Sequence, residues 1–221
     1  MREREFKILQ KEAYQYIKDR ILDGSMEYNC IYSESRLALE LGISRTPVRD
    51  AVHRLFQEGL IDIMPNKGFV LHKMTQQDVI EIYDVRSAIE GYCSRKAASD
   101  IQSDEAQKLI HTLKDSLKKQ REIFESTQDI DLFAEEDQHF HYLLVSYSGN
   151  EAFIEIFSQY MYKIKKLACY SLSKDNRMEH TLLEHEKIVK EICSGNMQGA
   201  YDAILYHMRA PLDINLESIY A

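Results

Sequence analysis

The chain contains 221 residues, of which 44% are hydrophobic and 29% are charged, as in ordinary globular proteins. No apolar run reaches the length of a membrane span, and the charged N-terminus, Met-Arg-Glu-Arg-Glu, is unlike a secretion signal. Cys30, Cys93, Cys169 and Cys193 are scattered and form no C-x-x-C pair, which argues against a disulfide framework and indicates reduced thiols. The composition therefore predicts a cytoplasmic protein without a membrane partner.

The net charge of -8 is distributed unevenly along the sequence. Residues 1–72 contain 11 Lys and Arg residues and 11 Asp and Glu residues, so the whole acidic excess lies in residues 73–221. A neutral N-terminal part can still attract phosphates if its basic residues gather on one face, because the local potential governs the encounter.

Two helical patterns begin the chain. Residues 8–23 have apolar side chains at helical spacing and predict an opening helix. Residues 33–60 then predict two short helices joined at a tight turn. Leu37 and Leu41 are four residues apart and share one helix face, and a turn glycine follows at Gly42.

The second helix of this pair is expected to have Thr46 as its N-cap and Pro47 in the first helical position. Its apolar residues fall at i, i+3, i+4 and i+7, which predicts one buried stripe: Val48, Ala51, Val52 and Leu55. Arg45, Thr46 and Arg49 are left exposed at the start of the helix. A helix-turn-helix protein inserts this end into the DNA major groove, where arginine can donate two hydrogen bonds to guanine. A generic helical hairpin with a basic tip is the alternative.

Two short β-prone runs follow, Gly59–Met64 and Phe69–Leu71, and the turn between them carries a lysine at its tip. Together with the helix pair they predict a winged helix. The sequence Ser44-Arg45-Thr46-Pro47-Val48-Arg49-Asp50-Ala51, with Gly59-Leu60 and Lys67-Gly68, resembles the GntR family of bacterial winged-helix transcription regulators. The resemblance implies that DNA is contacted by seven residues: Arg36, Ser44, Arg45, Thr46, Arg49, Lys67 and Gly68.

Two positions depart from the family pattern. Glu34 is followed by Ser35 where the family usually has an arginine, and Arg36 lies one place later. The usual Pro-Gly before this helix is replaced by Tyr28-Asn29, in which asparagine can adopt a left-handed turn. The displaced arginine affects one expected DNA contact and not the fold.

Residues 74–221 have a helical pattern almost throughout. We expect six helices, at about 75–99, 103–126, 128–147, 150–171, 176–194 and 197–219. Pro211 is expected to kink or end the last one. The predicted fold class is therefore mostly α, with a winged helix-turn-helix domain in residues 1–73 and an antiparallel six-helix bundle in residues 74–221. Residues 82–90 resemble the first helix of the FCD ligand-binding domain of FadR-type regulators, and the short bundle resembles the VanR branch.

Four residues of the bundle are candidates for a metal site. Asp137 and His141 are four residues apart and share one helix face, where they can chelate one divalent cation, although most such pairs are ordinary polar contacts. His185 and His207 lie on the last two helices, where a histidine is more often a satisfied core residue. The resemblance implies that these four form the Asp-His-His-His metal set of FCD domains. We expect one divalent ion per chain, zinc first, with nickel, manganese or iron as alternatives.

The coordination positions of the metal ion that the four side chains leave open are expected to bind a small organic acid, the effector. Arg86 matches an arginine of the family pocket and is expected to contact the carboxylate, while an exposed ion pair with Glu90 is the alternative. Asn150 matches a Gly-Asn beside that pocket, although helix capping explains it equally well.

These features predict a ligand-responsive transcription regulator, in the usual family arrangement a repressor, that binds a palindromic operator as a homodimer. One alternative is a metal-dependent enzyme with a DNA-binding appendage, in which Glu184 is the base to test. No convincing general base is found near the metal set, so an enzyme is not expected. The other alternative is a regulator whose metal is purely structural.

Overall fold

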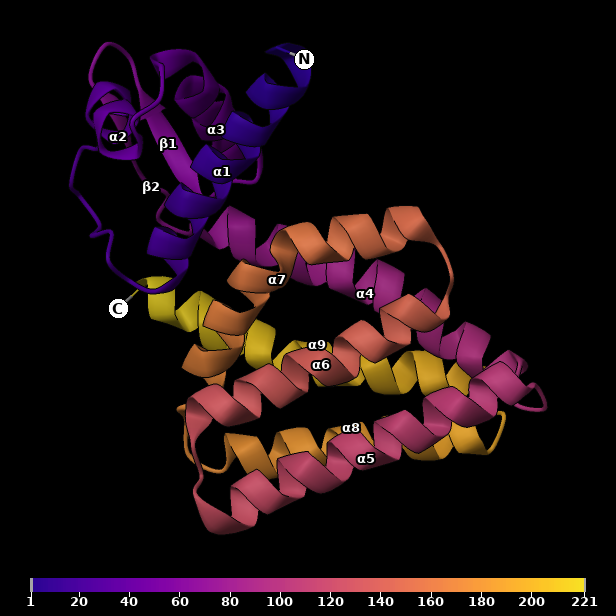
Figure 1. Cartoon of the computed structure of the whole chain (residues 1–221). Helices are drawn as coiled ribbons and strands as arrows, with labels where there is room; N and C mark the ends of the chain where they lie inside the picture. The colour runs from indigo at the N-terminus through magenta and orange to yellow at the C-terminus, as the bar shows by residue number, and fades with distance from the viewer. Residues whose placement is uncertain (1, 221) are drawn as a thin grey trace. The chain divides into compact units, whose positions relative to one another are not determined.

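The computed structural model of the chain describes residues 2–220, and side chains within residues 6–217. The chain divides into two compact units, Met1–Met74 and Thr75–Ala221, named here the N-terminal unit and the C-terminal unit (Figure 1). The described residues form nine helices and one two-stranded sheet, which confirms the predicted, mostly α fold class. Among them, none of the helices combines the length and apolar composition that a membrane crossing requires.

The N-terminal unit contains three helices: α1 (Arg2–Leu22), α2 (Glu34–Leu41) and α3 (Arg45–Gln57). Helix α1 begins at Arg2, earlier than the expected residue 8, because a charged first turn has no apolar periodicity to reveal it. The predicted stripe of α3 is buried, with Val48, Val52 and Leu55 fully inaccessible, and α3 packs against both α1 and α2. The helix-turn-helix pair is thus held by an apolar core.

The turn between α2 and α3 depends on Gly42. Its φ of 66° lies in the left-handed region, which glycine adopts without strain. In this conformation the Gly42 amide donates to Leu39 O at 3.2 Å and the Ile43 amide donates to Ala38 O at 3.0 Å. These bonds satisfy carbonyls at the end of α2 and direct the chain into α3.

The start of α3 corrects one prediction. Ser44, and not Thr46, occupies the N-cap position, and the helix begins at Arg45. Pro47 is consequently the third helical residue. Its missing N–H is still one of the first-turn donors that have no partner within the helix, so the proline is tolerated there.

The predicted wing is present as the antiparallel pair β1 (Ile61–Met64) and β2 (Gly68–Leu71), with Ile61 opposite Leu71. Tyr32 adds one further bridge, because its amide donates to Phe69 O at 2.8 Å and its carbonyl accepts from the Phe69 amide at 3.0 Å. This bridge brings the Tyr32 carbonyl so close to Gly68 that a Cβ there would lie 2.0 Å from the oxygen. Gly68 is therefore required by the backbone packing of the wing.

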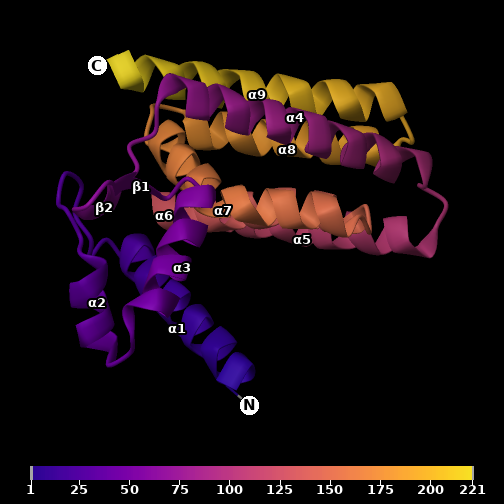
Figure 2. The same cartoon turned by 90° about the horizontal axis from the view of Figure 1, so that it is seen from above.

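The C-terminal unit is the predicted six-helix bundle. Its helices are α4 (Gln76–Ser99), α5 (Asp104–Ser126), α6 (Ile130–Tyr147), α7 (Glu151–Leu172), α8 (Arg177–Cys193) and α9 (Met197–Tyr220). Helix α4 lies alongside α9, and α6 packs against α5 and α7 (Figures 1 and 2). The start of α4 has a capping box, in which Thr75 and Asp78 each accept the other's backbone N–H.

Pro211 lies within α9, and the helix continues to Tyr220. Pro211 was expected to kink or end this helix, and the second of these alternatives is wrong, whereas the predicted range of about 197–219 agrees with the observed one. Helix α9 packs along α4, and burial of an apolar face supplies more helix stability than local propensity does.

Candidate metal centre and DNA-contact surface

The residues expected to contact DNA all lie in the N-terminal unit. Six of them have exposed side chains, and the seventh, Gly68, is partly buried in the wing. Two of the arginines form ion pairs at the surface: Arg45 lies 3.5 Å from Glu34, and Arg36 lies 3.2 Å from Glu40. The structure therefore leaves the N-terminal end of α3 and the tip of the wing accessible to a partner.

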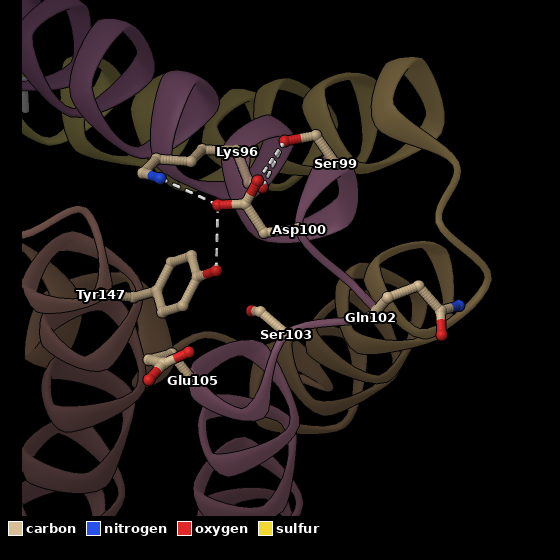
Figure 3. Close-up of a pocket in the computed structure, with 7 residues that line it drawn as sticks. All are labelled: Lys96, Ser99, Asp100, Gln102, Ser103, Glu105 and Tyr147. Atoms are coloured by element: carbon tan, nitrogen blue, oxygen red, sulfur yellow. Dashed lines mark hydrogen bonds and ion pairs between the residues drawn. The ribbon is translucent and has the colours of Figure 1, made fainter.

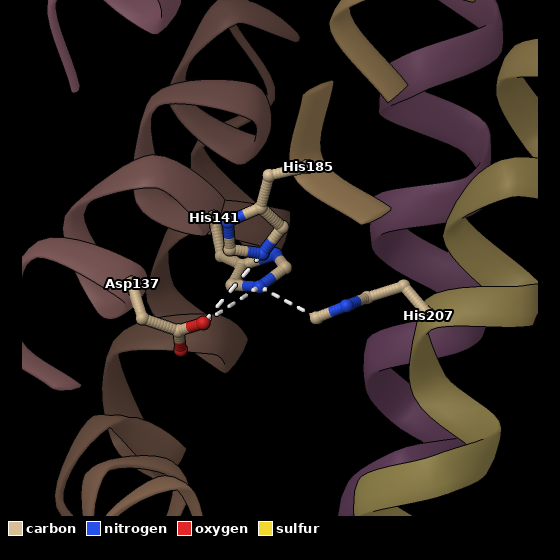
Figure 4. Close-up of side chains that lie close together, drawn as sticks. All are labelled: Asp137, His141, His185 and His207. Atoms are coloured by element: carbon tan, nitrogen blue, oxygen red, sulfur yellow. Dashed lines mark hydrogen bonds and ion pairs between the residues drawn. The ribbon is translucent and has the colours of Figure 1, made fainter. Parts of the chain in front are cut away.

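In the C-terminal unit, Asp137, His141, His185 and His207 come together although they belong to three helices. Helix α6 supplies the aspartate and the first histidine, α8 the second and α9 the third. All four side chains are buried, and one potential ligand atom from each lies within 4.8 Å of the others. Figure 4 shows the three imidazole rings and the carboxylate pointing toward one another.

The inward-facing atoms are the carboxylate oxygen Oδ1 of Asp137 and the Nε2 atoms of the histidines. His207 Nε2 lies 3.2 Å from His141 Nε2, and Asp137 Oδ1 lies 3.5 Å from His185 Nε2 and 3.9 Å from His141 Nε2. The four-residue spacing on α6 places Asp137 and His141 one turn apart on the buried face, as predicted.

The outer nitrogen of each imidazole, Nδ1, faces an acceptor from a different part of the chain. His141 Nδ1 lies 2.5 Å from Glu90 Oε2. His207 Nδ1 lies 2.7 Å from Glu184 Oε2. The third acceptor is an amide oxygen, since His185 Nδ1 lies 2.8 Å from Oε1 of Gln120 on α5. The contacts of His185 and His207 are hydrogen bonds, whereas His141 and Glu90 are in close contact without hydrogen-bond geometry. An N–H at Nδ1 leaves Nε2 as the lone-pair nitrogen, which is how histidine ligands of metals are oriented.

Two buried arginines hold the acidic acceptors. Arg86 Nε donates to Glu90 Oε1 at 2.8 Å, and the Arg177 guanidinium forms a two-pronged pair with Glu184 at 2.8 and 2.6 Å. Burial alone would raise the pKa of both carboxyls, but the adjacent arginine and histidine outweigh it and lower the pKa to about 2 in each. Both glutamates are therefore ionised.

Burial, followed by the neighbouring imidazoles, lowers the pKa of His185 well below its usual value. Burial also lowers the pKa of His207, although Glu184 opposes the shift. Both rings are thus neutral near pH 7, and the neutral imidazole is the form that binds a metal.

The donor set fits a divalent metal ion. His185 Nε2 is buried inside the cluster and has no hydrogen-bond partner among the described residues, a costly state for a polar atom in a protein interior. Three imidazole nitrogens and one carboxylate oxygen suit zinc, nickel, manganese or iron, and they leave coordination positions for a further ligand. The geometry is that of a candidate metal centre with prearranged ligand orientation.

Comparison with protein families places both units. The FCD domain matches residues 81–210, and the gntR family of bacterial regulatory proteins matches residues 9–71. The chain belongs to the GntR family of transcription regulators with an FCD domain. This assignment sets aside the enzyme alternative, because the matched families and relatives are regulators.

Two relatives of this GntR-family regulator are similar over most of their length. The uncharacterized HTH-type transcriptional regulator YdhC of Bacillus subtilis is 27% identical over 196 residues, 89% of this chain and 86% of the relative. The gluconate operon transcriptional repressor of Bacillus licheniformis is 27% identical over 184 residues, 80% of this chain and 72% of the relative.

Solved structures show the same fold. A GntR transcriptional regulator from Rhodococcus sp. RHA1 superimposes with a TM-score of 0.72 at 19% identity, covering 95% of this chain and 98% of that one. A structure described as the metal-free FCD domain of a transcriptional regulator gives a TM-score of 0.55 at 20% identity, covering 67% of this chain and 98% of that one.

The two residues predicted to contact the organic acid, Arg86 and Asn150, lie in different environments. Arg86 does form the ion pair with Glu90 that was the alternative, but the pair is buried and not exposed, and Arg86 Nη2 has no hydrogen-bond partner among the described residues. Asn150 is exposed, and its Oδ1 caps α7 by accepting from the Ala152 and Phe153 amides. Capping thus accounts for its position.

Sequence reasoning did not find the residues around the cluster. Gln120 and Arg177 carry no motif, and the sequence indicates Glu184 only as a candidate catalytic base. Arg86 and Glu90 were noticed as a four-residue pair, yet nothing in the spacing linked them to His141. The signal that could have been used for Glu184 is its position directly before a candidate ligand.

An open pocket of about 430 Å³ lies at one end of the bundle, between the end of α4, the start of α5 and Tyr147 of α6 (Figure 3). Three of its polar side chains contact one another, since Asp100 accepts from Lys96 at 2.8 Å and from Tyr147 Oη at 3.1 Å. This pocket shares no residue with the metal cluster. The buried cluster is therefore the candidate functional site of the FCD domain.

Proposed function

We propose that this regulator is a repressor that binds a palindromic operator as a homodimer in the cytoplasm and responds to a small organic acid. In this proposal Asp137, His141, His185 and His207 hold one divalent metal ion per chain, with zinc as the first candidate. The observation that carries the proposal is the convergence of these four buried side chains inside the FCD domain.

The DNA-binding part of the proposal rests on the accessible start of α3. Ser44, Arg45, Thr46 and Arg49 are exposed there, opposite a buried apolar stripe, and Arg36 and Lys67 are exposed nearby in sequence on α2 and the wing turn. An arginine at the front of a recognition helix can bind guanine O6 and N7 together. Two such helices related by a twofold axis match a palindrome, which supports the dimer.

The effector part rests on the buried guanidinium of Arg86. Its free Nη2 donor lies on a side chain that is already tied to the centre through Glu90 and His141. A carboxylate bound to the metal could accept this hydrogen bond. A contact from Asn150 stays a prediction. To act as an effector, the acid must bind two conformations of the regulator with different affinity.

The first experiment is selection of genomic DNA fragments by the purified, zinc-loaded chain, followed by sequencing. A recurring short palindrome in the retained fragments is the expected result. The double variant Arg45→Ala, Arg49→Ala is the matched control and should lose the enrichment while keeping its helical content. Absence of enrichment by the wild-type chain at low salt would contradict the DNA-binding proposal.

The selected operator then distinguishes an effector site from a purely structural metal. Titration of small organic acids against the regulator–operator complex should weaken DNA binding if the acid relieves repression. Operator affinity that is indifferent to every acid tested would favour the structural role, because an effector must couple to DNA binding. The metal content of each sample has to be measured alongside.

A further inference from the structure

Helices α1 and α3 of the N-terminal unit pack side by side (Figure 2). Gln10 of α1 donates to Asp50 of α3 at 2.6 Å. Two turns further along, Lys18 pairs at 3.1 Å with Glu58, the residue that follows α3. Both contacts join residues that are 40 positions apart in the sequence. Because this register is constant, the two helices run in broadly the same direction, and α1 starts at the same end of the unit as α3.

Two lysines lie on the side of α1 that borders α3. Lys7, Lys11, Tyr14 and Lys18 follow one another at spacings of four, three and four residues, which places them on one stripe of the helix. The last two members of this stripe both contact Glu58. The offset of 40 positions puts the first two members level with the first two turns of α3. Both of these lysine side chains are exposed.

The exposed surface along this pair of helices is basic. Asp50 is only partly exposed and accepts its hydrogen bond from α1. The side chain of Glu58 is 10% exposed and contacts three side chains of the two helices. Lys7, Lys11 and Arg49, in contrast, are exposed. An N-terminal unit with equal numbers of acidic and basic residues can therefore present a positive surface here, because these two carboxylates are held between the helices.

The spacing of the two helices suits a phosphate contact better than a base contact. Packed helices lie about 8–10 Å apart, and the major groove of B-DNA is about 12 Å wide. A helix packed beside the one in the groove therefore lies over the edge of the groove, where the phosphate backbone runs. The lysine ammonium is a point charge on a long, flexible stem, so it can bind a phosphate without the fixed geometry that two-pronged base recognition requires.

We propose that Lys7 and Lys11 extend the DNA-contact surface from α3 onto α1 and bind backbone phosphates beside the major groove that α3 enters. This inference rests on the proposed DNA binding by the start of α3 and adds a second helix to that surface. Phosphate contacts carry no direct sequence information. The two lysines therefore contribute to the affinity and orientation of the unit on DNA, whereas Arg45 and Arg49 select the operator.

The test measures how salt affects binding of the full-length, zinc-loaded chain to the selected operator and to random DNA. The variant Lys7→Ala, Lys11→Ala should reduce the slope of log K against log salt by about 2, since each phosphate contact contributes about 0.9. The advantage of the wild-type chain should then shrink about tenfold between about 50 and 200 mM salt. The loss should be the same on both DNAs. Alanine has the highest helix propensity, so α1 should keep its structure.

Two further variants and one chemical probe complete the test. Lys7→Arg, Lys11→Arg keeps both charges and should retain the wild-type slope. Lys108→Ala, Lys114→Ala removes two exposed lysines from α5, changes the net charge by the same amount and should leave the slope unchanged. Ethylation of operator phosphates locates the contact, because modification at the edge of the groove should weaken binding of the wild-type chain and not that of the α1 alanine variant.

The outcomes separate this inference from the function on which it rests. An unchanged slope in the α1 alanine variant overturns the inference and leaves the contacts from α3 standing. A loss confined to the operator also overturns it, because that result indicates base recognition. An equal loss in the α5 variant would assign the effect to net charge and not to position, which is a third contradiction. If the wild-type chain binds no DNA at low salt, the proposed DNA-binding function itself fails, and the inference fails with it.

Discussion

The two units of the regulator bury different kinds of side chain. Among the described side chains, the core of the N-terminal unit is apolar and aromatic, whereas the charged and histidine side chains that are buried all belong to the C-terminal unit. The N-terminal unit has its charged side chains exposed, as in the Arg36–Glu40 pair, where the arginine is 82% exposed, or partly buried, as in the Lys18–Glu58 pair. The C-terminal unit places Arg86, Glu90 and Arg177 in its interior.

In the N-terminal unit, the residues of the core and the residues expected to contact DNA are different. In the C-terminal unit, the same buried side chains contribute to the core and to the candidate metal centre. An exposed arginine on α3 can be replaced without disturbing Val48 or Leu55, which hold the helix from the opposite face. In the other unit, the partly buried Glu184 pairs with Arg177 inside the bundle and also contacts His207, a candidate metal ligand. Substitutions in the two units should therefore have separable effects on stability, metal binding and DNA binding.

The largest expected effect is on stability. Arg177→Gln leaves Glu184 without its two-pronged partner, and breaking a buried ion pair costs about 3–5 kcal/mol of unfolding free energy. Arg36→Gln breaks an exposed pair and should cost at most about 1 kcal/mol. Urea unfolding of the two variants measures the difference. Equal destabilisation would mean that the interior charges are not coupled as the distances indicate.

The next effect is on metal affinity. His185→Ala removes a candidate ligand, so we expect a loss greater than the roughly 100-fold upper range seen when only an outer partner of a ligand is removed. Competition with a chromophoric chelator measures the affinity. His180→Ala, on the exposed face of the same helix, is the control. Stoichiometric, tight zinc in the His185 variant would remove it from the ligand set.

A smaller loss is expected when a ligand is kept but its orientation is released. Gln120→Leu removes the amide oxygen that faces His185 Nδ1 and leaves the charge of the centre unchanged. Zinc affinity should fall about 10- to 100-fold. Gln107→Leu, an exposed glutamine on the same helix, should have no effect. An unchanged affinity in the Gln120 variant would argue against the orienting role of the outer acceptors.

The smallest expected effect in free energy is at the DNA surface. Arg49→Ala should cost about 1–3 kcal/mol of binding to the selected operator if its side chain contacts a base, without changing the unfolding free energy. Lys67→Ala should instead weaken binding to operator and random DNA alike, as for a phosphate contact. Filter binding with both DNAs measures this. A loss by the Arg49 variant that is equal on random DNA would make it a phosphate contact too.

The sequence predicted the helices where local signals are strong. The six helices of the C-terminal unit lie close to their predicted ranges, and the glycine turn of the helix-turn-helix motif is present. The start of α3 was misplaced because Ser44 and Thr46 are both good cap residues, and local chemistry alone does not choose between them. Helix α9 passes Pro211 because tertiary packing overrides a local preference.

Less of the candidate metal centre than of the fold could be predicted from the sequence. The four-residue spacing of Asp137 and His141 and a family resemblance were sufficient to propose the metal set. The acceptors around it were not predictable, since Gln120 and His185 are 65 positions apart and no periodicity relates them. Burial of the Arg86–Glu90 pair was not predictable either, because an i, i+4 pair has the same spacing on an exposed helix face and on a buried one.

The contacts that run from Arg86 through Glu90, His141, His207 and Glu184 to Arg177 have a consequence for how such a regulator can diversify. Each of these residues contacts another residue of the set. A substitution of one of them therefore leaves a charge or a polar atom without its partner until a second substitution compensates for it. We expect the centre to be inherited as a block, with its members changing in pairs. The exposed residues of α3 carry no such constraint, so target sites can drift one substitution at a time while the sensed chemical stays the same.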